Sequence, residues 1–150
     1  MKLIIVRGIP GSGKSTYSEK LRAKMIRFGY KPNEIVHYEA DMYLIEDDGE
    51  YRWTEEKSGK AHKWCYLRVK DALDAGKSVI VSNTFLKRKA MKEYFRLAKD
   101  YDADLEIYHC MGRWDNIHAV PIEKLNEMKD AEQNIEGETI VNAEEIEAEG

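Results

Sequence analysis

The residues from Gly8 to Thr16 carry the clearest chemical signal in the sequence. They read Gly-Ile-Pro-Gly-Ser-Gly-Lys-Ser-Thr and fit the pattern G-x-x-x-x-G-K-[ST]. Glycines at these spacings let backbone N–H groups converge on phosphate oxygens, and a helix that begins here adds partial positive charge. The residues expected to bind the triphosphate of ATP are Gly8, Pro10, Gly11, Ser12, Gly13, Lys14, Ser15 and Thr16.

Two side chains of this loop have distinct expected roles. Lys14 is expected to reach the β- and γ-phosphates, and the Ser15 hydroxyl is expected to bind Mg²⁺. Because the Lys14 charge faces the transferred group, Lys14 is also a candidate catalytic residue. ATP and Mg²⁺ are therefore the predicted cofactors.

A carboxylate follows the second predicted strand. In open parallel sheets the chemistry gathers beyond the carboxyl ends of the strands, where Asp41 is expected to accept a proton from an attacking hydroxyl. The alternative for Asp41 is a helix N-cap or a water-exposed loop residue. Glu39, two residues earlier on the same side of an extended chain, is the weaker candidate for the base.

Polar residues also follow the third and fourth predicted strands. Asn83 either orients a substrate or a magnesium-bound water, or caps the next helix. Arg113 either neutralises charge during phosphoryl transfer, which makes it a candidate catalytic residue, or stacks on Trp114 at the surface.

A basic run begins four residues after Asn83. It consists of Lys87, Arg88, Lys89, Lys92 and Arg96. With Asn83, Lys87 and Arg88 are the candidate substrate-binding residues for a phosphate-backed acceptor, and the alternative is a solvated helix face. His62 and Trp64 are interpreted as a buried histidine and a core aromatic residue.

These residues require a framework of strands and helices. Apolar strands are predicted at residues 2–6, 35–38, 78–81 and 105–108, with a short edge strand at 139–141. Helices are predicted from about residue 14 to Phe28, around 61–73, at 87–99 and after Pro121. Continuous apolar strands between amphipathic helices predict a three-layer α/β/α fold of the P-loop kinase type with a mainly parallel sheet.

Length and charge indicate one domain with an acidic end. The chain has 150 residues, with 24 Lys and Arg against 28 Asp and Glu. We expect a domain over residues 1–135 and an acidic, mainly solvated tail over 136–150, part of which can be ordered; the tail holds six Glu and no Lys or Arg. No apolar run approaches the roughly 20 residues of a membrane helix or forms a signal-peptide core. A cytoplasmic protein without membrane contact is therefore expected, and the sequence does not predict its oligomeric state.

The sequence resembles the small P-loop kinases related to phage-type polynucleotide 5′-hydroxyl kinase, from Lys2 to about Met128. The matching segments are the P-loop, Ala-Asp-Met-Tyr at 40–43, Gly-Glu-Tyr at 49–51, Ala-His-Lys-Trp-Cys at 61–65, the strand 79–84, and His-Ala-Val-Pro at 118–121. The resemblance implies that Asp41 is the general base and that the acceptor is the 5′-hydroxyl of a polynucleotide.

The sequence also departs from those kinases. Leu44 replaces an arginine, Asn83 replaces an aspartate, and the lid arginine falls near Asp115, so that Arg113 is its nearest substitute. The predicted function is magnesium-dependent transfer of the ATP γ-phosphate to a polynucleotide 5′-hydroxyl. The alternatives are a nucleoside or small-molecule kinase, and a nucleotide-dependent binding module that hydrolyses ATP slowly.

Overall fold

A five-stranded parallel sheet forms the centre of the computed structural model, which describes residues 1–45, 54–114 and 120–147. The spatial order is β2-β3-β1-β4-β5, and every neighbouring pair is parallel. The strands are β1 (Lys2–Arg7), β2 (Ile35–Glu39), β3 (Ser78–Asn83), β4 (Asp104–Cys110) and β5 (Thr139–Val141). Because all strands run the same way, their carboxyl ends lie at one edge of the sheet, where the P-loop follows β1.

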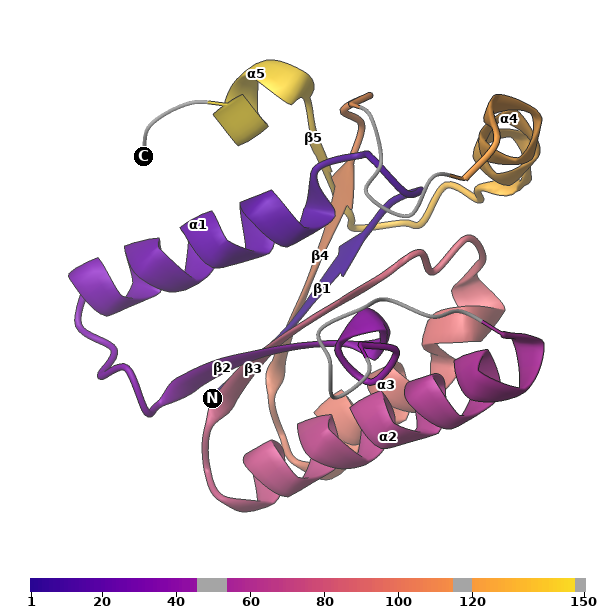
Figure 1. Ribbon diagram of the computed structural model, residues 1–150. Helices are drawn as coiled ribbons and strands as arrows, with labels where there is room; N and C mark the ends of the chain where they lie inside the picture. The colour runs from indigo at the N-terminus through magenta and orange to yellow at the C-terminus, as the bar shows by residue number, and fades with distance from the viewer. Residues whose placement is uncertain (46–53, 115–119, 148–150) are drawn as a thin grey trace.

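Helices cover both faces of the sheet (Figure 1). One face carries α1 (Lys14–Arg27) and α5 (Ala143–Glu147), and the other carries α2 (Glu55–Asp74) and α3 (Arg88–Asp100). A short 3-10 helix (Ala40–Met42) follows β2, and α4 (Ile122–Ala131) lies near the carboxyl ends of the strands. The predicted three-layer fold is confirmed.

Alternate residues of β1 enter two separate cores. Leu3 and Ile5 are fully buried against α2 and α3, whereas Ile4 and Val6 are buried on the side of α1 and α5. Successive strand side chains point to opposite faces, so a strand covered on both faces must be apolar throughout. This is why the continuous apolar run at 3–6 marks a central strand.

The apolar residues of the predicted second helix lie at helical spacing and enter the core. The buried residues of α2 are Ala61, Cys65, Val69, Ala72 and Leu73. Phe28, by contrast, is 74% exposed. It is the C-cap of α1, where Gly29 turns the chain with φ +122°, so its side chain no longer follows the helix.

Residues 136–147 are part of the folded body, so the prediction of a mainly solvated tail is wrong for Val141 and Ile146, which are buried. The edge strand at 139–141 is confirmed, since β5 pairs with β4. Ile146 of α5 is 2% exposed, and the Glu138 carboxylate lies 2.8 Å from buried Arg7. Although most residues of this segment are acidic or polar, its apolar residues Val141 and Ile146 pack into the core.

Three stretches lie outside the described residues, namely 46–53, 115–119 and 148–150. They include the Gly-Glu-Tyr segment at 49–51, Asp115, and the His-Ala pair at 118–119. Among the described residues, no helix is long and apolar enough to cross a membrane.

Candidate functional site

The loop between β1 and α1 has the backbone that its glycines predict. Gly11 and Gly13 have φ values of +78° and +92°, a region that side chains with a Cβ disfavour. A Cβ added at Gly8 would lie 2.2 Å from the Ser12 Oγ atom and 3.0 Å from the Cys110 carbonyl oxygen, so a side chain there would force its neighbours to shift. The loop is therefore a tight cradle that leads directly into the N-terminus of α1.

Several features of this cradle fit a polyphosphate. The first turn of α1 has neither a side-chain cap nor an acidic residue, which leaves its N–H groups for an anion. The Ser12 hydroxyl is buried and has no hydrogen-bond partner among the described residues. Burial lowers the pKa of Lys14, although the charges of Asp41 and Glu39 oppose this shift. A bound phosphate would supply the missing partners.

A cavity of about 440 Å³ opens beside the P-loop. Its polar lining includes Lys14 and Asp41, together with Asn83 at the end of β3 and Thr84 just after it. The structure thus brings the predicted phosphate-binding lysine and the predicted general base to one space. A hydroxyl compound in this cavity would lie next to a γ-phosphate held by the loop.

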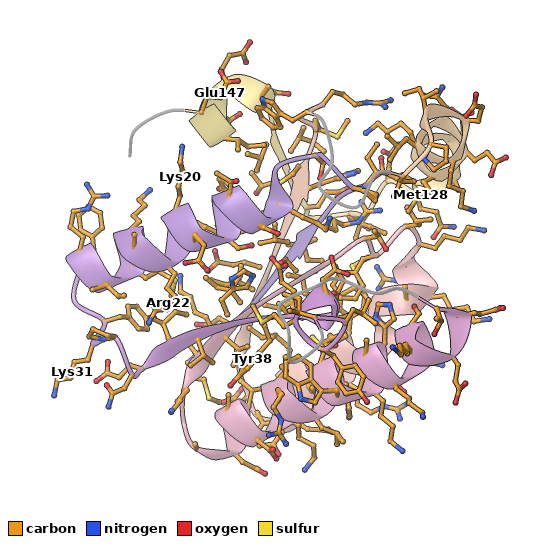
Figure 2. All side chains as sticks on the ribbon, viewed as in Figure 1. Lys20, Arg22, Lys31, Tyr38, Met128 and Glu147 are labelled. Carbon is orange, nitrogen blue, oxygen red and sulfur yellow. The ribbon has the colours of Figure 1, made fainter. Side chains whose placement is uncertain are left out.

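The lining of the cavity is mainly apolar. Its apolar residues include Leu44, Ala61, Pro121 and Met128. Met128 lies on the side of α4 that faces the centre of the molecule (Figure 2). Such a lining suits a planar or apolar group better than a chain of hydroxyls, because hydroxyls would lose their water partners there.

Glu39 and Asp41 have different surroundings. The Glu39 carboxylate accepts a hydrogen bond from Ser82 Oγ at 2.6 Å and lies 3.1 Å from His37 Nε2. Burial alone would raise the pKa of Glu39, but hydrogen bonds from His37, Ser15 and Ser82 lower it to about 2. Glu39 is therefore an anion held against Ser15, whereas Asp41 lines the cavity.

Asn83 is a buried support for the loop that carries Asp41. Its Oδ1 atom accepts the Ala40 N–H at 2.9 Å, and its Nδ2 atom donates to Cys65 Sγ at 3.8 Å. The alternative of a helix cap is wrong, because α3 has Lys87 as N-cap and no side-chain cap bond. Asn83 also borders the cavity, so a role toward the substrate stays a prediction.

Arg113 lies in a segment that binds back onto the P-loop. The Gly112 N–H donates to the Ser12 carbonyl at 3.1 Å, and the Trp114 N–H donates to the Gly11 carbonyl at 2.8 Å. The Arg113 side chain is exposed beside these contacts. Among the described residues the cation–π contact joins Arg88 to Phe95, so the alternative of Arg113 stacking on Trp114 is not supported.

The predicted substrate-binding cations lie at the start of α3, outside the cavity. The Arg88 guanidinium covers the Phe95 ring at 5.0 Å, and the Arg88 N–H donates to Gln133 Oε1 at 2.8 Å. Among the described residues, the cations that line the cavity are Lys14 and Lys124. Lys124 belongs to α4 and was not predicted, because no local pattern shows where α4 packs.

His62 was also misread from the sequence. Its side chain is exposed and borders the cavity, instead of being buried in the core. Partial desolvation lowers the pKa of His62, and the negative charge of Asp41 opposes this. Trp64 packs as expected, with its ring 6.1 Å from Tyr38 and 6.0 Å from Tyr43. A neutral His62 can hydrogen-bond an acceptor group.

Residues 3–132 match the family model described as an AAA domain (AAA_33). The chain belongs to this family. Uncharacterized protein PM0531 of Pasteurella multocida is 29% identical over 133 residues, which cover 84% of the chain and 73% of that protein. Human NEDD4-binding protein 2 is 29% identical over 136 residues, which cover 84% of the chain but only 7% of that protein.

Solved structures with this fold include several kinases. A sugar kinase from Janibacter sp. HTCC2649 superposes with a TM-score of 0.61 at 17% identity, covering 95% of this chain and 85% of that one. A chain of the Pnkp1/Rnl/Hen1 RNA repair complex superposes with a TM-score of 0.56 at 20% identity, covering 97% of this chain and 42% of that one. The AAA-domain chain therefore shares a P-loop kinase-like fold with these proteins. At 17% and 20% identity, the likeness concerns the fold alone.

Proposed function

We propose that this AAA-domain protein is a magnesium-dependent phosphotransferase that moves the γ-phosphate of ATP to a hydroxyl group. The observation that carries the proposal is the shared cavity of Lys14 and Asp41 beside the P-loop. One end of that cavity meets the loop expected to hold a triphosphate, and the rest has room for an acceptor.

The residues divide the reaction between them. The loop N–H groups and Lys14 hold the triphosphate and stabilise the charge that develops on the transferred group. Asp41 accepts the proton of the acceptor hydroxyl as its oxygen attacks phosphorus in line with the departing ADP oxygen. Arg113, at the edge of the loop, is proposed to neutralise charge during the transfer.

The residues around Ser15 fit a magnesium ion. Mg²⁺ prefers oxygen ligands and is usually bound through one or two carboxylates together with substrate phosphates. The Ser15 hydroxyl and the ionised Glu39 carboxylate supply such oxygens, and they already contact each other. When bound, the ion would offset the negative charge of the phosphate oxygens. In this assignment the carboxylate that acts on the acceptor is Asp41, which lines the cavity.

The proposed acceptor is the 5′-hydroxyl end of a polynucleotide. The apolar lining formed by Leu44, Ala61, Pro121 and Met128 favours an acceptor with a planar base over a polyol. Lys124 can meet the following phosphate, and Lys87 and Arg88 are proposed to contact phosphates further along. Small hydroxyl compounds are the competing acceptors, since solved structures with this fold include a sugar kinase and a gluconokinase.

An acceptor screen tests the proposal. The protein is incubated with Mg²⁺ and ATP labelled at the γ-phosphate, together with an oligonucleotide, a nucleoside or a sugar. We expect label on the oligonucleotide, and Lys14→Ala as the control should remove it. Label on the nucleoside or the sugar alone would replace the acceptor but keep the reaction class. Label released only as free phosphate would favour a nucleotide-dependent binding module.

A further inference from the structure

The backbone of Gly112 and Trp114 is hydrogen-bonded to the P-loop. The Gly112 N–H donates to the Ser12 carbonyl and the Trp114 N–H donates to the Gly11 carbonyl, at 3.1 and 2.8 Å. These two bonds join the end of the β4 segment to the phosphate-binding loop. The backbone that carries the indole ring is therefore held to the loop.

One side of the ring packs directly on glycine. A methyl group added at Gly13 would lie 2.7 Å from the Cζ3 atom of Trp114, and one added at Gly112 would lie 2.0 Å from it. Ile146 of α5 borders the same spot, at 3.0 Å from the added Gly13 carbon. Trp114 as a whole is nevertheless 40% exposed. A large aromatic surface thus remains open beside the triphosphate cradle.

The ring lies across the P-loop from the acceptor cavity. Ile146 belongs to the core on the α1 side of the sheet, whereas Leu44 and Ala61 of the cavity wall belong to the core on the α2 side. In the proposed function the γ-phosphate faces Asp41 on the α2 side. The nucleoside at the other end of the triphosphate must then leave the loop away from Asp41, toward the side of Trp114.

We propose that Trp114 is the platform on which the base of the bound nucleoside triphosphate stacks. This inference rests on the proposed nucleotide binding and adds the base subsite to it. The ligand class is a planar heterocycle joined to a triphosphate. Stacking on an aromatic ring accepts every base, because each has a π-face. We therefore expect ATP and GTP to bind alike.

Binding of two ligands to matched variants tests the inference. A non-hydrolysable ATP analogue and inorganic tripolyphosphate are titrated, each with Mg²⁺, into wild type, Trp114→Ala and Trp114→Phe. Stacking on one ring predicts that Trp114→Ala weakens the ATP analogue by about 5- to 150-fold. Tripolyphosphate affinity should be unchanged, and Trp114→Phe should keep most of the affinity for the analogue.

Tryptophan fluorescence gives a second readout that does not depend on the alanine variant. The ATP analogue, but not tripolyphosphate, should quench emission in wild type and in Trp64→Phe, and the quenching should disappear in Trp114→Phe. Trp64 is the matched control because it packs on Tyr38 and Tyr43, on the α2 side of the sheet.

Other results of these experiments would contradict the inference or the proposed function. An equal loss of both ligands in Trp114→Ala would make Trp114 a packing residue of the loop and nothing more. Unchanged binding of the ATP analogue in that variant, or quenching that survives in Trp114→Phe, would place the base elsewhere. If wild type binds tripolyphosphate and the analogue equally, there is no base subsite. If wild type binds neither, the proposed nucleotide function fails.

Discussion

Lys14, Asp41 and Glu39 form the charged centre of the candidate site. Both carboxylates act on the Lys14 charge, but only Asp41 lines the cavity, while Glu39 is held by Ser82, His37 and Ser15. A general base must reach the proton it accepts, so geometry favours Asp41. The carboxylate whose pKa is lowered to about 2 suits the magnesium side, because it stays ionised.

Asp41→Asn and Glu39→Gln should separate these roles. The amide of Asp41→Asn is nearly isosteric but cannot take a proton, so transfer should fall by about 10²–10⁴-fold while ATP affinity is kept. Glu39→Gln should instead raise the Mg²⁺ concentration needed for half-maximal turnover. Steady-state rates over a Mg²⁺ series, with ATP affinity from calorimetry, measure both effects. Wild-type turnover in Asp41→Asn, with Glu39→Gln inactive, would reverse the assignment.

Residues with a local sequence pattern could be predicted, and those that depend on helix docking could not. The P-loop and Asp41 are defined by their position after a strand, and the structure places them together. His62 and Lys124 reach the same cavity from α2 and α4. Their neighbours come from distant parts of the chain, so no spacing in the sequence could indicate them.

At the scale of elements, a buried ionic network joins the ends of several segments. Arg7, at the end of β1, donates to the carbonyls of Phe85 and Leu86 at 2.9 and 3.0 Å. Its Nη1 atom donates to His109 Nδ1 at 3.0 Å and to Glu138 Oε1 at 2.8 Å. The network therefore fixes the strand before the P-loop against the connection to α3 and the residues before β5.

Glu132, at the C-cap of α4, extends this network. Its contacts make the stability of the fold sensitive to acid. His109 Nε2 lies 2.7 Å from its Oε2 atom and Lys129 Nζ lies 2.7 Å from its Oε1 atom. Burial would raise the pKa of Glu132, but these hydrogen bonds lower it below 4.5. The resulting stability is present above pH 4.5 and is lost as the pH falls through the lowered pKa.

Glu132→Gln should therefore be less stable than wild type at neutral pH and should lose less stability on acidification. Urea unfolding at neutral pH and at several pH values below 4.5 measures this slope. The control is Glu123→Gln, an exposed residue of the same helix, which should behave as wild type. Parallel curves for wild type and Glu132→Gln would contradict the assigned pairing.

The basic run at the start of α3 makes a separate prediction about the acceptor. If Lys87, Arg88 and Lys89 neutralise phosphates beyond the reacting end, replacing them by alanine should flatten the salt dependence of oligonucleotide binding by about two log–log units. A matched triple variant at Lys24, Lys31 and Lys77 removes the same charge at the opposite end of the sheet and should keep the slope. Equal slopes in both variants would make the run a solvated helix face.

At the scale of the whole molecule, the C-terminal segment belongs to the folded body. Val141 is fully buried, Ile146 is 2% exposed, and Glu138 partners Arg7. The fold class was predictable because four continuous apolar strands alternate with helices. The packing of the C-terminal segment onto the domain was not predictable, because six of its fifteen residues are glutamates. Two buried apolar residues and one buried ion pair outweigh that composition.

Truncation after Ile135 should therefore destabilise the protein strongly. Breaking a buried ion pair by removing one partner costs about 3–5 kcal/mol, and the loss of Val141 and Ile146 adds to this. Total stability is about 5–15 kcal/mol, so we expect a partly or fully unfolded chain. Truncation after Glu147 is the matched control and should unfold as wild type does. Urea unfolding followed by circular dichroism makes the comparison, and equal midpoints would contradict the fold assignment of residues 136–147.

Phosphoryl transfer to a defined hydroxyl is the central claim, and one pair of substrates tests it most directly. Two oligonucleotides of the same sequence, one with a 5′-hydroxyl and one with a 5′-phosphate, are incubated with the protein, Mg²⁺ and ATP labelled at the γ-phosphate. We predict label on the 5′-hydroxyl oligonucleotide alone, and none with Asp41→Asn. Label on neither oligonucleotide, with phosphate released at the same rate in both, would contradict transfer to a polynucleotide 5′-hydroxyl.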